Sequence, residues 1–189
     1  GYHYPVPQMD ARRAIRMMRF KARDWEIDPG KIGILGFSAG GHLCSTAVTM
    51  FDDEFEQETN DPVDQLSCRP DFGVLCYPVI AMGQPYCHQG SVRNLLGASP
   101  SKGLMARNNT AMRVTNRTPP IFLVHSADDR AVPLRNGTDF AVACAAKGVP
   151  VTCHFYAQGG HGYGLGRSGD SKSWPSRLEE WLRHNEWME

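Results

Sequence analysis

The sequence lacks an apolar run near 20 residues, any Cys-x-x-Cys pair and any excess of charge of one sign. The first absence argues against a membrane-spanning helix, and no segment has the charged start and apolar middle of a signal peptide. The second argues against zinc and thioredoxin chemistry, so we expect neither a metal nor a cofactor. Twenty Lys and Arg residues balance twenty Asp and Glu residues, which favours neither nucleic acid nor a membrane as a partner. We therefore expect a soluble protein, either cytoplasmic or secreted after removal of a signal that this chain does not contain.

The composition predicts one globular domain over residues 1–189. Hydrophobic residues make up 41% of the chain and charged residues 21%, a balance typical of a folded core under a polar surface. This length is sufficient for one core and too short for two comfortable domains. The cysteines are too scattered for a disulfide-stapled domain, and we expect buried free thiols. They are Cys44, Cys68, Cys76, Cys87, Cys144 and Cys153.

Short apolar runs, typical of strands covered on both faces, alternate with helical patterns. The runs are Ile32–Phe37, Phe72–Tyr77, Ile121–His125 and Val151–Tyr156. The helical patterns between and after them are Ala39–Met50, Ser91–Leu96, Leu134–Lys147 and Trp174–Trp187. This alternation predicts an α/β fold with a mainly parallel sheet and helices on both faces.

Charged residues gather in two further places. Ala11–Trp25 has the spacing of an amphipathic helix with Asp10 as its N-cap, and we expect its polar face to be solvated. That face carries Arg12, Arg16, Arg19 and Arg23. Seven acidic residues without a Lys or Arg lie between Asp52 and Asp64, where a solvated loop is favoured over a cation site.

The segment Gly36–Gly40 fits the pattern Gly-x-Ser-x-Gly, directly after an apolar run and directly before a helix. Such a turn is so tight that the flanking positions must lack bulk, which explains the glycines on either side of Ser38. The turn places the hydroxyl at a helix N-terminus, where the backbone N–H of Ala39 can donate to an oxyanion. This context predicts Ser38 as a nucleophile.

An acid and a base are expected later in the chain, each at the carboxyl end of a strand. Asp128 and Asp129 follow the third apolar run, and both stand in position to be the acid. His161 lies in a glycine-rich loop after the fourth run, and this loop allows the ring to approach the serine. The other histidines after the acid pair fall in a strand and in the terminal helix: His154 and His184. We therefore predict His161 as the base.

A set of segments spread over nearly the whole chain carries a likeness to a known family. They are Asp24–Pro29, Gly36–Leu43, Cys68–Asp71, Asn94–Gly97, Pro119–Pro120, Asp129–Pro133 and Gly160–Gly162. Together they resemble the carbohydrate acetylesterases of the α/β-hydrolase superfamily, which include acetyl xylan esterases and proteins of the esterase/lipase type. In that family the acid is the aspartate of an Asp-x-x-Val-Pro pattern, so the resemblance assigns it to Asp129, with Asp128 as the close alternative.

The resemblance implies a serine esterase that hydrolyses short acyl esters, foremost acetyl esters, of carbohydrates such as acetylated xylan. His161 would deprotonate Ser38, Asp129 would orient His161, and water would release the acyl group from the serine. Two alternatives stay open. One is a broader short-chain carboxylesterase or a peptidase with the same triad, and the other is a poorly active truncated hydrolase that acts as a binding module.

The chain departs from the family at its front. Members normally begin with several strands and a His-Gly-Gly-type loop that supplies a second oxyanion donor, and neither is present here. We therefore expect lower turnover, since loss of one such donor costs about 10²- to 10³-fold. We also expect an unpaired edge along Ile32–Phe37, whose only nearby charge is Lys31. A homodimer or higher oligomer that covers this edge is the predicted assembly.

Residues 78–118 form a long connection that leaves a strand on the predicted active-site side. We predict that it is an insertion covering the substrate, an acyl ester or acetylated saccharide. His88 and Gln89 are available in it to bind sugar hydroxyls. Its predicted apolar lining is Met82, Pro85, Tyr86, Met105 and Met112.

Overall fold

The four predicted apolar runs form the strands of one parallel sheet. A computed structural model describes residues 2–55, 61–166 and 169–189. The strands are β1 (Gly33–Phe37), β2 (Phe72–Cys76), β3 (Ile121–Ser126) and β4 (Val151–Tyr156). Their order across the sheet is β1-β2-β3-β4, and every neighbouring pair is parallel. The predicted α/β fold class is confirmed, and each strand matches its predicted range within one residue.

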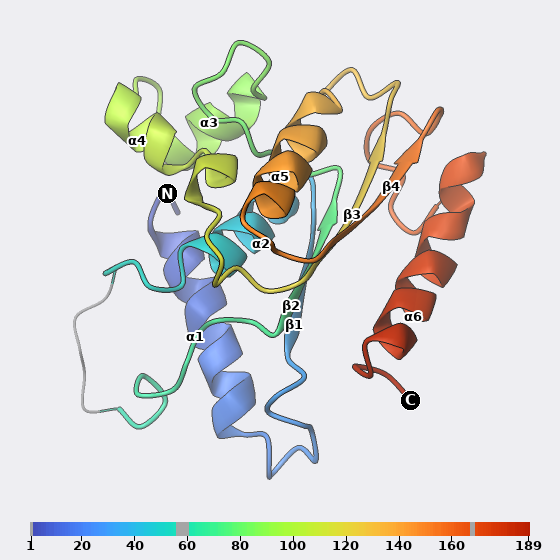
Figure 1. Ribbon diagram of the computed structural model, residues 1–189. Helices are drawn as coiled ribbons and strands as arrows, with labels where there is room; N and C mark the ends of the chain where they lie inside the picture. Colours follow the sequence, from blue (N-terminus) through green and yellow to red (C-terminus); the bar gives the residue numbers. More distant parts are fainter. Residues whose placement is uncertain (1, 56–60, 167–168) are drawn as a thin grey trace.

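Helices cover both faces of this sheet (Figure 1). On one face lie α2 (Ala39–Thr49) and α5 (Arg135–Ala146), with α1 (Val6–Phe20) packed against α2. On the other face lies α6 (Trp174–His184). The long connection between β2 and β3 contains α3 (Gln89–Leu96), α4 (Lys102–Arg107) and a 3₁₀ helix η1 (Thr110–Arg113). A second 3₁₀ helix, η2 (Asp170–Ser173), precedes α6. Only α3 of the helices in the long connection was predicted.

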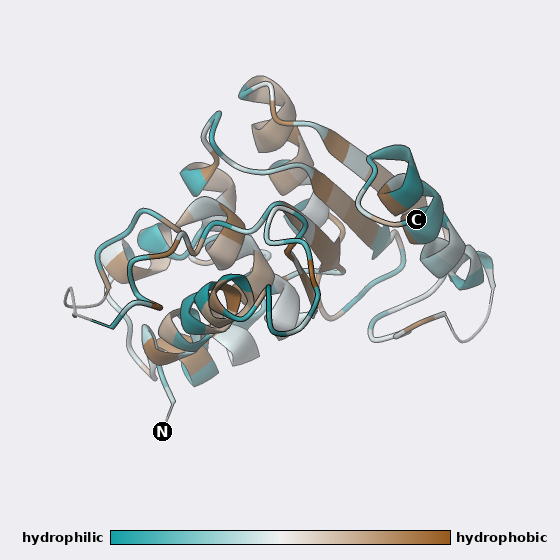
Figure 2. Cartoon of the chain, turned by 90° about the horizontal axis from the view of Figure 1, so that it is seen from below, coloured by the Kyte–Doolittle hydropathy of each residue, from teal (hydrophilic) through white to brown (hydrophobic). Residues whose placement is uncertain are grey.

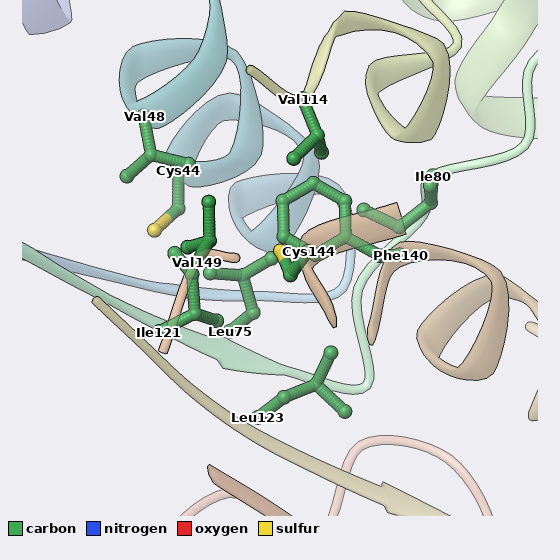
Figure 3. Close-up of a cluster of buried hydrophobic side chains, with 10 residues drawn as sticks. All are labelled: Cys44, Val48, Leu75, Ile80, Val114, Ile121, Leu123, Phe140, Cys144 and Val149. Atoms are coloured by element: carbon green, nitrogen blue, oxygen red, sulfur yellow. The ribbon is translucent and has the colours of Figure 1, made fainter. Parts of the chain in front are cut away.

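Two apolar cores, one on each face, hold the layers together. The core under α2 and α5 contains ten buried side chains around Leu75 and Phe140 (Figure 3). The core under α6 is largely aromatic, and its members include Phe122, Trp174 and Trp181. Figure 2 shows the central strands as mostly hydrophobic, because buried parallel strands need apolar side chains on both faces.

The strand that leads to Ser38 lies at an edge of the sheet. β1 pairs with β2 on one side, and no strand of the described residues pairs with its other side. Leu35 in the middle of β1 is 44% exposed. The predicted unpaired edge is therefore present in the described part of the chain. Its coverage by a second copy stays a prediction.

The first helix begins five residues earlier than predicted. α1 starts at Val6 with Pro7 in its first turn, where proline lacks an N–H that the helix does not use. Asp10 is therefore inside the helix and is not its N-cap, which corrects the prediction. The helix ends at Phe20, and the chain leaves it before reaching Trp25.

The polar face of α1 is buried against a loop, which corrects the expected solvation. Arg12 is only 7% exposed, and its guanidinium donates to the carbonyl oxygens of Phe51 and Asp53 at 3.1 and 2.6 Å. Its Nε also lies 3.2 Å from the Sγ of Cys68. Arg23, the last arginine of the stripe, lies beyond the helix and is exposed. Acceptors about 40 residues away in sequence therefore decide which arginines are buried.

The acidic stretch is paired with arginines rather than simply solvated. Asp53 accepts hydrogen bonds from Arg107 and Arg113 at 3.0 and 2.6 Å, and its side chain is 11% exposed. Asp64 accepts from Arg13 at 2.6 Å. Two acidic residues of the stretch lie outside the described residues: Glu56 and Glu58. The arginines of α1, α4 and η1 thus neutralise much of a charge cluster that looked unpaired in sequence.

Two predictions from composition can be compared with the structure. All six cysteines are free, as expected, and four of them are buried. Burial raises the pKa of the Cys44 and Cys144 thiols to about 12, so these two are not thiolate nucleophiles near neutral pH. Among the described residues, no helix combines the length and apolar character needed to cross a membrane.

Candidate active site

Ser38 occupies the sharp turn between β1 and α2. Its φ of +53° and ψ of −114° are unusual for a residue that carries a side chain. Its N–H donates to Cys76 O at 2.9 Å, and its carbonyl oxygen accepts from the N–H groups of His42 and Val79 at 3.1 Å. A strained backbone of this kind costs about 1–3 kcal/mol and persists only where the surroundings fix it. The turn presents the hydroxyl at the carboxyl end of the sheet, where α2 begins.

The glycines around Ser38 have different roles, which corrects the prediction that the positions on both sides must lack bulk. A Cβ on Gly36 would lie 2.0 Å from the carbonyl oxygen of Gly40, so close packing of strand against helix requires glycine there. A Cβ on Gly41 would lie 2.8 Å from Pro78, which is also too close. At Gly40 itself a Cβ would meet no described atom within 4 Å. The backbone is therefore closely packed at positions 36 and 41, whereas the space that a side chain at position 40 would occupy contains no described atom.

Ser38, His161 and Asp129 form one hydrogen-bonded row. Ser38 Oγ lies 2.8 Å from His161 Nε2, and His161 Nδ1 lies 2.7 Å from Asp129 Oδ2. An ionised carboxylate only accepts, so the proton of the neutral imidazole is on Nδ1. Nε2 is then free to accept the hydroxyl proton of Ser38. This is the arrangement that general-base activation of a serine requires.

Asp129 is held as a carboxylate by donors on both oxygens. Its side chain is fully buried. Oδ1 accepts from the N–H groups of Ala131 and Val132 at 3.0 and 2.9 Å. Burial alone would raise the pKa of Asp129, but hydrogen bonds from His125, His161 and Val132 outweigh it and hold the pKa well below its usual range. The group beside His161 Nδ1 is therefore ionised at neutral pH.

Asp128, the alternative candidate for the acid, contacts the backbone of the loop that carries His161 and not the imidazole ring. Its Oδ1 accepts from the N–H groups of Gly159 and Gly160 at 3.0 and 2.8 Å. The two neighbouring aspartates thus divide their contacts between the imidazole and the backbone that carries it. Tyr77 adds an edge-on ring contact to His161, with ring centroids 5.0 Å apart.

His125 is a neighbour of this site that the sequence reading missed, because it looked like an ordinary strand residue. It is completely buried in β3, and its Nε2 lies 3.3 Å from Asp129 Oδ2 and 2.8 Å from Val132 O. The only sequence signal is the spacing of four residues between His125 and Asp129. Outside helices, that spacing by itself predicts no contact.

The N–H group predicted as the oxyanion donor lies at the start of α2. Ala39 is the first residue of α2, and no hydrogen bond from its N–H to a described residue is found. The first N–H groups of a helix have no partner within it and favour negative charge. The N–H of Ala39 is therefore available beside the Ser38 hydroxyl. Among the described residues, no cluster of three or more His, Cys, Asp or Glu side chains has the arrangement to hold a metal ion.

A mainly apolar cavity of about 330 Å³ opens beside this turn. Its walls come from α1, α2 and the 78–118 segment. They are Pro7, Gln8, Ala39, Gly40, His42, Leu43, Met82, Ser91, Asn94 and Leu95. Ala39, the residue after Ser38, lines this cavity, whereas Ser38 and His161 are not among its lining residues.

The residues predicted to bind sugar hydroxyls are engaged with their neighbours. His88 caps α3, where its Nδ1 accepts from the N–H of Ser91 at 3.2 Å. Gln89 donates to Cys87 Sγ at 3.1 Å. Of the predicted apolar lining, Met82 reaches the cavity, whereas Met112 is 69% exposed. The role of residues 78–118 as a substrate cover stays a prediction, as does the single domain over 1–189.

Comparison with known proteins identifies the family of this chain. Residues 2–143, three quarters of the chain, match the BD-FAE family. The chain belongs to the BD-FAE family. Its fold is that of the α/β hydrolases, which several similar solved structures share.

Three relatives of this BD-FAE chain carry names that concern xylan or xylosides. The acetyl ester-xyloside bifunctional hydrolase from Caldicellulosiruptor lactoaceticus has a TM-score of 0.94 and 42% identity, over all of this chain and 69% of that one. The acetylxylan esterase of Xylanibacter ruminicola is 35% identical over 165 residues, 85% of this chain and 32% of its own length. The endo-1,4-beta-xylanase B of Butyrivibrio fibrisolvens is 38% identical over 156 residues, 82% of this chain and 24% of its own length.

The BD-FAE chain thus spans a third or less of the length of the acetylxylan esterase and of the xylanase, which are much longer proteins. The predicted resemblance to carbohydrate esterases of the α/β-hydrolase superfamily is confirmed by these matches. The catalytic roles of Ser38, Asp129, His161 and Ala39 stay predictions that the geometry supports.

Proposed function

We propose that this BD-FAE chain is a serine esterase that hydrolyses short acyl esters of carbohydrates, foremost acetyl esters on xylan-type saccharides. The observation that carries the proposal is the row of hydrogen bonds from Ser38 through His161 to Asp129, at 2.8 and 2.7 Å. Such a row activates a hydroxyl that is otherwise a weak nucleophile.

In the first half of the reaction, Ser38 Oγ attacks the ester carbonyl carbon while its proton moves to His161 Nε2. The resulting imidazolium is stabilised by Asp129, which stays ionised. The tetrahedral oxyanion accepts a hydrogen bond from the N–H of Ala39 at the start of α2. When this intermediate collapses, the C–O bond to the alcohol breaks, and the alcohol leaves with the proton from His161.

In the second half, water attacks the acyl-serine. His161 takes a proton from the water and returns it to Ser38 Oγ as the carboxylic acid is released. Atoms balance over the two halves, since one water and one ester give one acid and one alcohol. No step requires a group beyond these side chains, one backbone N–H and water.

Two observations favour an acetylated saccharide as the substrate. The acetylxylan esterase and the acetyl ester-xyloside hydrolase among the relatives are named for this chemistry. The cavity beside Ala39 also contains Ser91 and Asn94 within a mainly apolar lining, which suits a sugar with both hydroxyls and an apolar face.

The test compares acetate release from acetylated xylan with hydrolysis of aryl esters of increasing acyl length. We expect acetate release from xylan and a fall in aryl ester turnover beyond short acyl chains. Ser38→Ala should lower both activities at least about 10³-fold while the circular dichroism spectrum is unchanged. A serine-directed fluorophosphonate should label the parent and not this variant.

Each alternative has its own result in the same test. Aryl ester hydrolysis without acetate release from xylan would indicate a broader short-chain carboxylesterase. Binding of acetylated xylo-oligosaccharides without any turnover or labelling would indicate a binding module, and would overturn the proposal.

A further inference from the structure

A second histidine contacts the carboxylate that faces His161. His125 lies on the buried side of Asp129, with both side chains 0% exposed, and its Nε2 is 3.3 Å from Asp129 Oδ2. His161 Nδ1 is 2.7 Å from the same oxygen, on the side where the serine lies. One carboxylate oxygen therefore receives an imidazole from each side.

The neighbours of His125 identify its protonated nitrogen. Nε2 lies 2.8 Å from the carbonyl oxygen of Val132, which can only accept, so Nε2 carries the proton. Nδ1 has no hydrogen-bond partner among the described residues, and a Cβ on Gly137 would lie 2.9 Å from it. A second proton on Nδ1 would be buried without an acceptor, which is costly. The geometry thus places the Nε2–H of His125 against the Val132 carbonyl oxygen, with Asp129 Oδ2 3.3 Å from the same nitrogen.

This contact completes the set of donors around Asp129. The N–H groups of Ala131 and Val132 donate to Oδ1, His161 Nδ1 lies 2.7 Å from Oδ2, and His125 Nε2 lies 3.3 Å from the same oxygen. A carboxylate held at both oxygens cannot rotate without breaking buried hydrogen bonds. Without His125, Oδ2 would contact His161 alone. His161 is the residue that Asp129 must itself orient.

We propose that His125 is a positioning residue for the esterase reaction: it fixes Asp129 from the buried side so that Oδ2 faces His161 Nδ1. The inference rests on the proposed function, because it concerns the same site. The competing interpretation is structural only. In it, His125 ties the end of β3 to Val132, and its proximity to Asp129 has no effect on turnover.

Two polar variants of similar size separate these interpretations. The amide NH₂ of His125→Gln corresponds in position to Nε2 and can reach Asp129, whereas that of His125→Asn corresponds to Nδ1 and cannot. We expect His125→Asn to lower kcat on an aryl acetate about tenfold with KM changed less than twofold. His125→Gln should recover most of the loss. Equal kcat values in two folded variants would overturn the proposal.

A double-mutant cycle shows whether His125 acts through Asp129. Rates of Ser38 labelling by a fluorophosphonate are compared for His125→Asn in the parent and in Asp129→Asn. We expect His125→Asn to lower the labelling rate about tenfold in the parent. In the Asp129→Asn background it should have no effect, because the carboxylate that His125 would orient is already absent. The same drop in both backgrounds would overturn the inference. If His125→Asn does not fold, as shown by circular dichroism, His125→Gln is used in the same cycle and should show a smaller drop confined to the parent.

Failure of the proposed function is distinguishable from failure of this inference. A parent protein that neither hydrolyses esters nor reacts with the fluorophosphonate overturns the proposed function itself. If the parent is reactive but the effects of His125→Asn and Asp129→Asn on the labelling rate are additive, only the role of His125 is overturned.

Discussion

The two neighbouring aspartates make a sharp test of the site, because the structure fixes how an amide would lie at each position. At Asp129, Oδ1 accepts two backbone N–H groups, so the oxygen of an introduced amide must take that place. In Asp129→Asn the NH₂ group is therefore directed to the place of Oδ2, facing His161 Nδ1 and His125 Nε2. It donates to Nδ1 and moves the imidazole proton to Nε2, where Ser38 needs an acceptor.

The expected magnitudes differ widely. The wrong tautomer at the base lowers kcat by about 10⁴-fold, or about 5.5 kcal/mol in the barrier. In Asp128→Asn the amide oxygen can still accept from Gly159 and Gly160, and only the charge is lost. Neutral hydrogen bonds are roughly half as strong as charge-assisted ones, so about 1 kcal/mol and about a fivefold fall in kcat are expected.

The assay is the initial rate of aryl acetate hydrolysis near pH 7, with the unfolding midpoint of each variant measured in urea. Asp128→Asn is the matched control, since it makes the same chemical change one residue away. Refutation would come from an Asp129→Asn variant within tenfold of the parent, or from an Asp128→Asn variant that loses more activity than Asp129→Asn.

Three further predictions concern stability. Gly36→Ala places a Cβ 2.0 Å from a backbone oxygen, and we expect it to lower the free energy of unfolding by about 3 kcal/mol or more. In Gly40→Ala the Cβ meets no described atom within 4 Å, so the free energy of unfolding should change by less than about 1 kcal/mol. Urea unfolding of the two variants measures this, and equal losses would refute the packing argument. Burial lowers the pKa of His42 to about 4. Below about pH 6.5 the unfolded chain therefore binds a proton at this histidine, whereas the folded protein does not bind it until about pH 4. Stability should therefore be full above pH 6.5 and fall by about 3 kcal/mol between pH 6.5 and 4, and His42→Gln should flatten this part of the pH profile if the assignment is right. Arg12→Ala leaves one buried and one partly buried carbonyl group without their donor and should cost about 2–4 kcal/mol. Arg23→Ala, at an exposed position, should cost less than about 0.5 kcal/mol. Thermal melts that rank Arg23→Ala as the more damaging change would contradict the burial described for Arg12.

The sequence alone determined the strands of the sheet and named the candidate site residues. Apolar runs bounded by turn residues mark all four strands, because strands covered on both faces need apolar side chains along their whole length. Gly36–Gly40 is a local signal, since a tight turn depends on neighbouring residues. His161 followed from elimination among the three histidines after the acid pair. The strands and the turn need only short-range chemistry, whereas the choice of Asp129 over Asp128 came from the resemblance to the carbohydrate acetylesterases.

Tertiary structure alone decided which polar groups are buried and what they contact. The acceptors of Arg12 lie about 40 residues away, so the helical spacing of α1 could not show that its basic face is covered. The contact of His125 with Asp129 depends on how the loop after β3 folds back on the strand. The different roles of Gly36 and Gly40 depend on the distance between β1 and α2. Such contacts are set by the packing of whole elements, and a pattern of residue types along the chain carries no information on that packing.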